Sequence, residues 1–217
     1  MTELAALYPF LEPAGRPDPA AVLADVTRST VEKVGEIGRL RTAVAEAEAE
    51  RLAACATAMA ERFAAGGRLH TFGNGGSSTD ATALAALFVA PGPGRRRLPA
   101  VSLTDDVATL TALANDVGFE VVFARQIAAA ARPDDVALGL STSGGSANVL
   151  RGFAAARARG LLTVGLAGYS GGPMAEAAAR GEIDHLFVMP SASVHRIQEA
   201  QTTTYHVLWE LVQQALA

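Results

Sequence analysis

The chain has 217 residues, half of them apolar, with 18 Lys and Arg against 22 Asp and Glu and a formal charge of −4. This composition excludes a disordered chain, and its acidic balance disfavours binding to nucleic acid or to an anionic membrane surface. No apolar run reaches the ~18 residues of a membrane span, and a single cysteine, Cys55, excludes an intramolecular disulfide. We therefore expect a folded protein of the cytoplasm.

The N-terminal part of the sequence changes character after residue 19. Four prolines within residues 1–19 predict an irregular arm, and Asp18-Pro19 is typical of a helix start. From Ala20 to residue 66 the chain lacks proline and is rich in Ala, Glu, Arg and Leu, which predicts a helical extension. We expect two helices here, broken around Gly35–Gly38, and one domain that includes this extension and covers residues 20–217.

After Gly67, short apolar runs alternate with Ala-rich helical segments. Such alternation predicts an α/β fold, a three-layer sandwich in which helices cover both faces of a parallel sheet. The expected strands lie near 68–73, 99–103, 135–140, 162–167 and 185–188, and the expected helices near 78–90, 107–115, 120–132, 146–159, 173–180 and 194–216.

Two of the expected strands end in loops rich in Gly, Ser and Thr, at residues 71–80 and 140–148. Loops between a strand and a helix lie at the carboxyl edge of a parallel sheet, where glycines let backbone amides approach an anion. The second loop offers four hydroxyls and no Lys, which suits one small phosphate monoester. Neither the Gly-Lys-Ser/Thr phosphate loop nor Gly-x-Gly-x-x-Gly is present, which disfavours nucleotide hydrolysis and dinucleotide binding. Either loop alone is also explained by turns and helix caps.

Four separated motifs, in this order and spacing, resemble the sugar isomerase (SIS) domain of the phosphoheptose isomerase group. They are residues 73–77 (GNGGS), 114–119 (ANDVGF), 141–144 (STSG) and 196–199 (RIQE). The resemblance implies a five-stranded parallel sheet in flavodoxin-like order, N-terminal helices, and a homotetramer with sites between subunits. It implies conversion of sedoheptulose 7-phosphate to an aldoheptose phosphate. It assigns sugar-phosphate binding to Asn74, Gly75, Gly76, Ser77, Asp105, Asp106, Ser141, Thr142, Ser143, Ser146 and Gln198.

The same resemblance implies a zinc ion that this sequence does not match. Family members ligate zinc through a His and a Glu on the helix after the first loop, and a Gln and a His on the last helix. The matching positions are Ala83 and Leu87 on the first helix, and Gln198 and His206 on the last. Because zinc sites generally use three or four protein ligands, we predict no zinc of the family type and no other cofactor.

Glu199 and His206 are the candidate catalytic residues for the proton transfer. They are seven residues apart, which places them within about 20° of the same helix face. Two other interpretations stay open: Glu199 is a structural partner of Arg196, and His206 is a packed, satisfied side chain.

The sequence thus predicts an aldose–ketose isomerase that acts on a sugar phosphate similar to sedoheptulose 7-phosphate through an enediol. The expected partners are this small phosphorylated sugar and other copies of the chain, with neither nucleic acid nor membrane. The alternative is a catalytically degenerate SIS protein that binds a sugar phosphate as a sensor or as a protein partner.

Overall fold

The computed structural model describes residues 18–217, which form two compact units, a first that ends at Gly38 and a second that spans Arg39–Ala217. Apart from Asp18 and Pro19, the expected N-terminal arm lies outside the described residues. Across the described chain, no helix has both the length and the apolar character needed to cross a membrane. The assignment of residues 20–217 to a single domain stays a prediction.

The first described element is a long helix, α2, at Pro19–Ala64. Asp18 precedes it and accepts a hydrogen bond from Ala20 N at 3.1 Å, so the predicted helix start is confirmed. The predicted break around Gly35–Gly38 is wrong, because the helix continues through both glycines. A glycine costs a helix only about 1 kcal/mol, and the surrounding Glu, Arg, Leu and Ala residues favour the helix enough to offset that cost.

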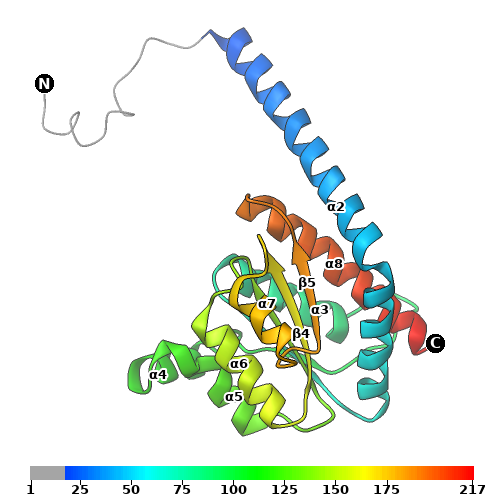
Figure 1. The fold of residues 1–217 in the computed structure, drawn as a ribbon, viewed down its shortest axis with the longest axis vertical. Coiled ribbons are helices and arrows are strands. Elements are labelled where there is room, and N and C mark those ends of the chain that lie inside the picture. The colour runs from blue at the N-terminus through cyan, green and yellow to red at the C-terminus, as the bar shows by residue number, and fades with distance from the viewer. Residues whose placement is uncertain (1–17) are drawn as a thin grey trace, which may run out of the picture. The chain divides into compact units, whose positions relative to one another are not determined.

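Five strands form one parallel sheet in the order β2-β1-β3-β4-β5, as predicted. Figure 1 shows its neighbouring strands β4 and β5. Neighbouring β1 and β3 pair Leu69 with Val136 at one end and Gly73 with Leu140 at the other. The strands are β1 (Leu69–Gly73), β2 (Ala100–Ser102), β3 (Val136–Ser141), β4 (Leu162–Gly168) and β5 (His185–Met189).

Helices connect the strands and cover both faces of the sheet. Successive residues of β1 face opposite sides: the Thr71 hydroxyl donates to Ala81 O of α3 at 2.7 Å, whereas the Phe72 ring packs against α5 and α6. Helix α8 contacts α3, β4 and β5. The helices are α3 (Gly76–Val89), α4 (Val107–Asp116), the short η2 (Phe119–Val121), α5 (Val122–Ala130), α6 (Ala147–Ala158), α7 (Gly172–Ala179) and α8 (Val194–Ala215).

Three phenylalanine rings fill the core between the sheet and α5–α6. The Phe72 ring centroid lies 5.4 Å from that of Phe123 and 5.3 Å from that of Phe153. Gly139 of β3 leaves the space that these rings occupy, because a Cβ there would lie 2.6 Å from Phe153 Cζ and 2.7 Å from Phe72 Cε2. A side chain at position 139 would therefore separate β3 from the helices that cover it.

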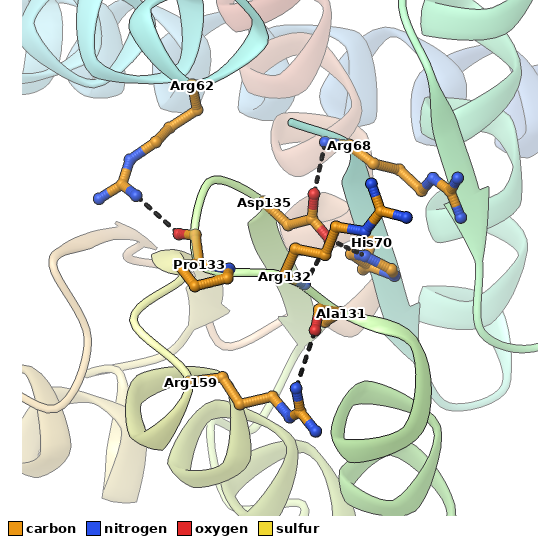
Figure 2. Close-up of polar contacts among 8 residues, drawn as sticks. All are labelled: Arg62, Arg68, His70, Ala131, Arg132, Pro133, Asp135 and Arg159. Atoms are coloured by element: carbon orange, nitrogen blue, oxygen red, sulfur yellow. Dashed lines mark hydrogen bonds and ion pairs between the residues drawn. The ribbon is translucent and has the colours of Figure 1, made fainter. Parts of the chain in front are cut away.

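A buried carboxylate, Asp135, organises the amino ends of β1 and β3 (Figure 2). It accepts hydrogen bonds from Arg68 N at 2.8 Å, from Arg132 N at 2.9 Å and from His70 Nε2 at 2.9 Å. Burial alone would raise the pKa of Asp135, but the hydrogen bonds from Arg132, His70 and Arg68 hold it below its ordinary value. Burial lowers the pKa of His70, which favours the neutral imidazole.

We expect Asp135→Asn to lower the free energy of unfolding by about 2–4 kcal/mol, because the buried donors lose their charged acceptor. Urea unfolding of the full chain measures this change. The matched control is Asp134→Asn at the neighbouring exposed position, which should change stability by less than about 0.5 kcal/mol. Equal effects of the two substitutions would contradict the role given to Asp135.

Candidate functional site

The two Gly- and Ser-rich loops lie side by side at the carboxyl edge of the sheet. One joins β1 to α3 and the other joins β3 to α6, and these two strands are neighbours. The Asn74 and Asn148 side chains connect the loops through two reciprocal amide hydrogen bonds, at 2.8 and 2.9 Å. The structure therefore brings the two predicted binding segments together.

Asn148 is a residue that the sequence analysis missed. Its side chain is almost fully buried, at 3% exposure, and its partner Asn74 is 74 positions away in the sequence. The available signal was its place at the start of the helix that follows the hydroxyl-rich loop. Only the strand pairing shows that an amide there meets the first loop.

The second loop forms an uncharged cradle at the N-terminus of α6. Ser141 Oγ and Ser146 Oγ are hydrogen-bonded at 3.1 Å, and Gly145 N donates to Ser143 Oγ at 3.2 Å. Gly144 has a φ of +66°, and a Cβ there would collide with Gly171 O. Gly144 O also accepts from Met174 N at 3.0 Å, which fixes the loop against the start of α7. Serine and threonine hydroxyls and the free amides of a helix N-terminus are neutral donors suited to a phosphate monoester.

The first loop meets α8 through a close contact between Gly76 and Gln198. A Cβ on residue 76 would lie 3.1 Å from Gln198 Cδ and would displace the amide at the end of this flexible side chain, so glycine lets the Gln198 amide approach the loop. Ser77 is buried in the same turn, and its backbone N donates to Asn74 O at 3.0 Å. The contact places the Gln198 amide beside the first loop, as the sequence analysis expected of a binding residue.

Asp105 and Asp106 lie in the loop between β2 and α4 and hold different local contacts. Asp106 caps α4, where its carboxylate accepts from Thr109 N at 3.0 Å and Thr109 Oγ1 at 2.6 Å. These hydrogen bonds lower the pKa of Asp106. Asp105 accepts from Thr82 Oγ1 of α3 at 2.9 Å. Asp105 is therefore tied to the helix that follows the first loop, whereas Asp106 is engaged as a cap.

The two candidate catalytic residues on α8 are not bonded to each other. The Glu199 carboxylate pairs with the Arg196 guanidinium, the contact that the structural interpretation expected. His206 is exposed, its ring lies 4.8 Å from that of Tyr205, and its Nδ1 bonds Thr202 O at 2.8 Å. Because a carbonyl oxygen only accepts, Nδ1 is the donor in this bond, and Nε2 has no hydrogen-bond partner among residues 18–217.

Asp80 is a residue of α3 that the sequence analysis did not select, and its side chain contacts α8. Its Oδ1 accepts from Thr202 Oγ1 at 3.3 Å and from Tyr205 OH at 3.5 Å. Burial raises the pKa of Asp80, and the two hydroxyl contacts lower it to a smaller extent. The sequence signal was that Asp80 is the only ionisable residue of α3.

The side chains present do not fit the zinc site that the resemblance implies. Ala83 and Leu87 have no ligand atom, which leaves one amide and one imidazole, Gln198 and His206, on α8. Within residues 18–217, no cluster of three or more His, Cys, Asp or Glu side chains is arranged to hold a metal ion. Two neutral ligands fall short of the three or four that zinc takes from proteins.

Comparison with known proteins agrees with this architecture. The SIS domain family model matches residues 34–168. The phosphoheptose isomerase of Roseiflexus sp. (strain RS-1) is 40% identical over 191 residues, covering 88% of this chain and 94% of that protein. That of Aquifex aeolicus (strain VF5) is 41% identical over 189 residues, covering 85% of this chain and 96% of that protein.

Solved structures extend the likeness to the fold. The phosphoheptose isomerase of Neisseria gonorrhoeae superposes with a TM-score of 0.80 at 31% identity, covering 87% of this chain and 99% of that one. The phosphoheptose isomerase of Francisella tularensis gives 0.74 at 30% identity, covering 85% of this chain and 98% of that one. With the family model matching residues 34–168 and relatives matched over nearly their whole length, the chain belongs to the SIS-domain family of phosphoheptose isomerases.

Proposed function

We propose that this protein is an aldose–ketose isomerase of a seven-carbon sugar phosphate similar to sedoheptulose 7-phosphate. The observation that carries the proposal is the pair of loops locked together by Asn74 and Asn148, one of them a hydroxyl cradle at a helix N-terminus. The names of the relatives support the reaction class.

The cradle supplies the binding energy that orients the sugar. Ser141, Thr142, Ser143 and Ser146 surround the start of α6, and Asn74, Gly75, Gly76, Ser77 and Gln198 lie at the adjoining loop and helix. A phosphate fixed at one end of the substrate holds the carbonyl end in one place, which removes much of the entropic barrier to proton transfer. We assign Asp105, beside α3, and Asp106 to the sugar hydroxyls.

Isomerisation also needs groups that move protons near the carbonyl carbon. His206 and Glu199 are the proposed catalytic residues on α8. His206 Nδ1 is bonded to Thr202 O, which leaves Nε2 as the nitrogen proposed to take part in proton transfer, and the Arg196 guanidinium orients the Glu199 carboxylate.

Proton NMR in deuterated water tests the reaction itself. We expect the purified protein to convert sedoheptulose 7-phosphate to the aldose and to introduce solvent deuterium at the carbon next to the carbonyl. Saturable binding with neither product nor exchange would contradict the isomerase and support the sensor alternative.

A charge placed in the cradle tests where the phosphate binds. Position 145 has room, because a Cβ there would meet its nearest atoms at 3.7–3.9 Å. We expect Gly145→Asp to raise KM at least about tenfold, since a like charge ~4 Å away costs about 1–4 kcal/mol. The matched neutral variant Gly145→Asn should leave KM within about threefold, because an uncharged amide repels nothing. An equal rise in both variants would place the phosphate elsewhere.

Metal removal tests the misfit of the zinc site. We expect activity after dialysis against a chelator to stay within about twofold of the untreated value, since two neutral ligands do not hold zinc tightly. Activity is measured before and after dialysis, and again after zinc is added. Loss on dialysis with recovery on zinc addition would contradict a metal-independent reaction.

We also propose a homotetramer whose sites lie between subunits. Helix α2 has an exposed apolar surface suited to a partner helix, made of side chains that are 44–67% exposed: Val22, Leu23, Val26, Val31 and Val34.

Light scattering should give four times the 22.3 kDa chain mass. Val26→Asp with Val34→Asp should reduce that mass, whereas Glu32→Gln on the same helix should not; an unchanged mass in the double variant would contradict this interface.

The proposed location is the cytoplasm, where a buried free thiol such as Cys55 stays reduced.

A further inference from the structure

Helices α3 and α8 meet at two successive contacts that are one helical turn apart. The first joins Gly76 to Gln198, and the second joins Asp80 to Thr202. Both helices advance four residues between these contacts, so Asp80 lies one turn along α3 from the first loop, on the same face. The carboxyl group is therefore next to the proposed sugar site.

The hydrogen bonds of Asp80 leave one of its oxygens free. The Thr202 and Tyr205 hydroxyls both donate to Oδ1, whereas Oδ2 has no hydrogen-bond partner among residues 18–217. No cation pairs with this carboxyl in the described chain, in contrast to Glu199 with Arg196. Burial raises the pKa of Asp80, so its protonated form persists to a higher pH than for an exposed aspartate.

The other titratable groups on elements that pack against α3 lie mainly on α8. This helix carries Tyr205, whose pKa is raised by burial, together with His195, His206, Glu210 and the Glu199–Arg196 pair. The strands that contact α3 are β1, β2 and β3, and their only titratable side chain is His70 at the opposite, amino end of the sheet. Asp105 approaches α3 at Thr82.

The reaction requires an electrophile at the carbonyl oxygen. As the enediolate forms, negative charge develops on that oxygen, and a positioned proton donor or a metal ion must stabilise it. Ala83 and Leu87 lie on the same face of α3 as Asp80, and neither side chain has an atom that could ligate a metal ion. A protonated carboxyl donates a hydrogen bond or a proton at such a place in a site of low polarity.

We propose that Asp80 is the acid that protonates the carbonyl oxygen of the ketose, in place of a metal ion. This inference rests on the proposed isomerase function. The base removes a proton from C1, the C–H electron pair forms the C1=C2 bond, and the carbonyl pair moves to O2, which takes the proton from Oδ2 of Asp80. The Asp80 carboxylate then takes the O1 hydroxyl proton as C1=O forms, and the base returns its proton to C2.

The substitution Asp80→Asn tests the role, because the amide oxygen still accepts from Thr202 and Tyr205 but the acid proton is gone. We expect kcat to fall by about 10²- to 10⁴-fold, the usual contribution of a general acid, with KM changed by less than about threefold. The matched control is Glu210→Gln, an exposed carboxyl on α8, which should leave kcat within about twofold. A kcat for Asp80→Asn within about threefold of wild type would overturn the inference.

The pH profile separates an acid from a merely structural carboxyl. In wild type, kcat should decrease as pH rises through the pKa of Asp80, because the acid form is lost. Thr202→Val removes a hydroxyl that lowers this pKa, so the decrease should move to higher pH. Thr202→Val also tests the acid role of Asp80 if the Asp80→Asn variant does not fold. A kcat that decreases at the same pH in Thr202→Val and in wild type would overturn the assignment.

The outcomes also separate this inference from the proposed function. A wild-type protein that binds the sugar phosphate without turnover or exchange overturns both. A wild-type protein that isomerises the sugar, with an equally active Asp80→Asn variant, overturns only the role of Asp80.

Discussion

The parallel register of β1 and β3 is the constraint on which the site depends. It sets Phe72 opposite Gly139 and Gly73 opposite Leu140, so the loops that follow the two strands begin side by side. The absence of a side chain at Gly139 lets the Phe72 and Phe153 rings close over β3. At the other end, Asp135 bonds the backbone of Arg68 and Arg132 and the ring of His70, which ties together the segments that enter both strands. The contacts of Asp135 at the amino edge of the sheet thus help to hold β1 and β3 together, and the two loops of the proposed site follow the carboxyl ends of these strands.

The part of the site proposed to bind the phosphate is made of neutral groups. Hydroxyls, backbone amides and the Asn74–Asn148 pair lie around the position proposed for one phosphate, and the close backbone contact of Gly144 with Gly171 O holds the second loop in place. Preorganised donors of this kind bind an anion without a large loss of side-chain entropy. The fold that holds these groups is similar to that of solved phosphoheptose isomerases.

The region between α3 and α8, where we propose that proton transfer occurs, differs from the pattern that the family resemblance implies. Two positions on α3 are apolar, so the seam between α3 and α8 relies on Asp80, Thr202 and Tyr205 for its polar contacts. Glu199 is paired with Arg196, and His206 keeps one free ring nitrogen. Proton transfer in this protein is therefore proposed to depend on the carboxyl groups of Asp80 and Glu199 and on the imidazole of His206.

The sequence by itself determined the alternating strands and helices and the two loops, because each follows from local composition and spacing. The lack of ligand atoms at Ala83 and Leu87 followed from comparing the sequence with the pattern of the family that it resembles. It misplaced a helix break at Gly35–Gly38, where the local glycine signal was weaker than the helix propensity around it. Only the tertiary structure decided that Asn148 meets Asn74 and that Asp80 meets α8. Partners 74 and 122 residues apart are brought together by strand register and helix packing, which no local pattern records.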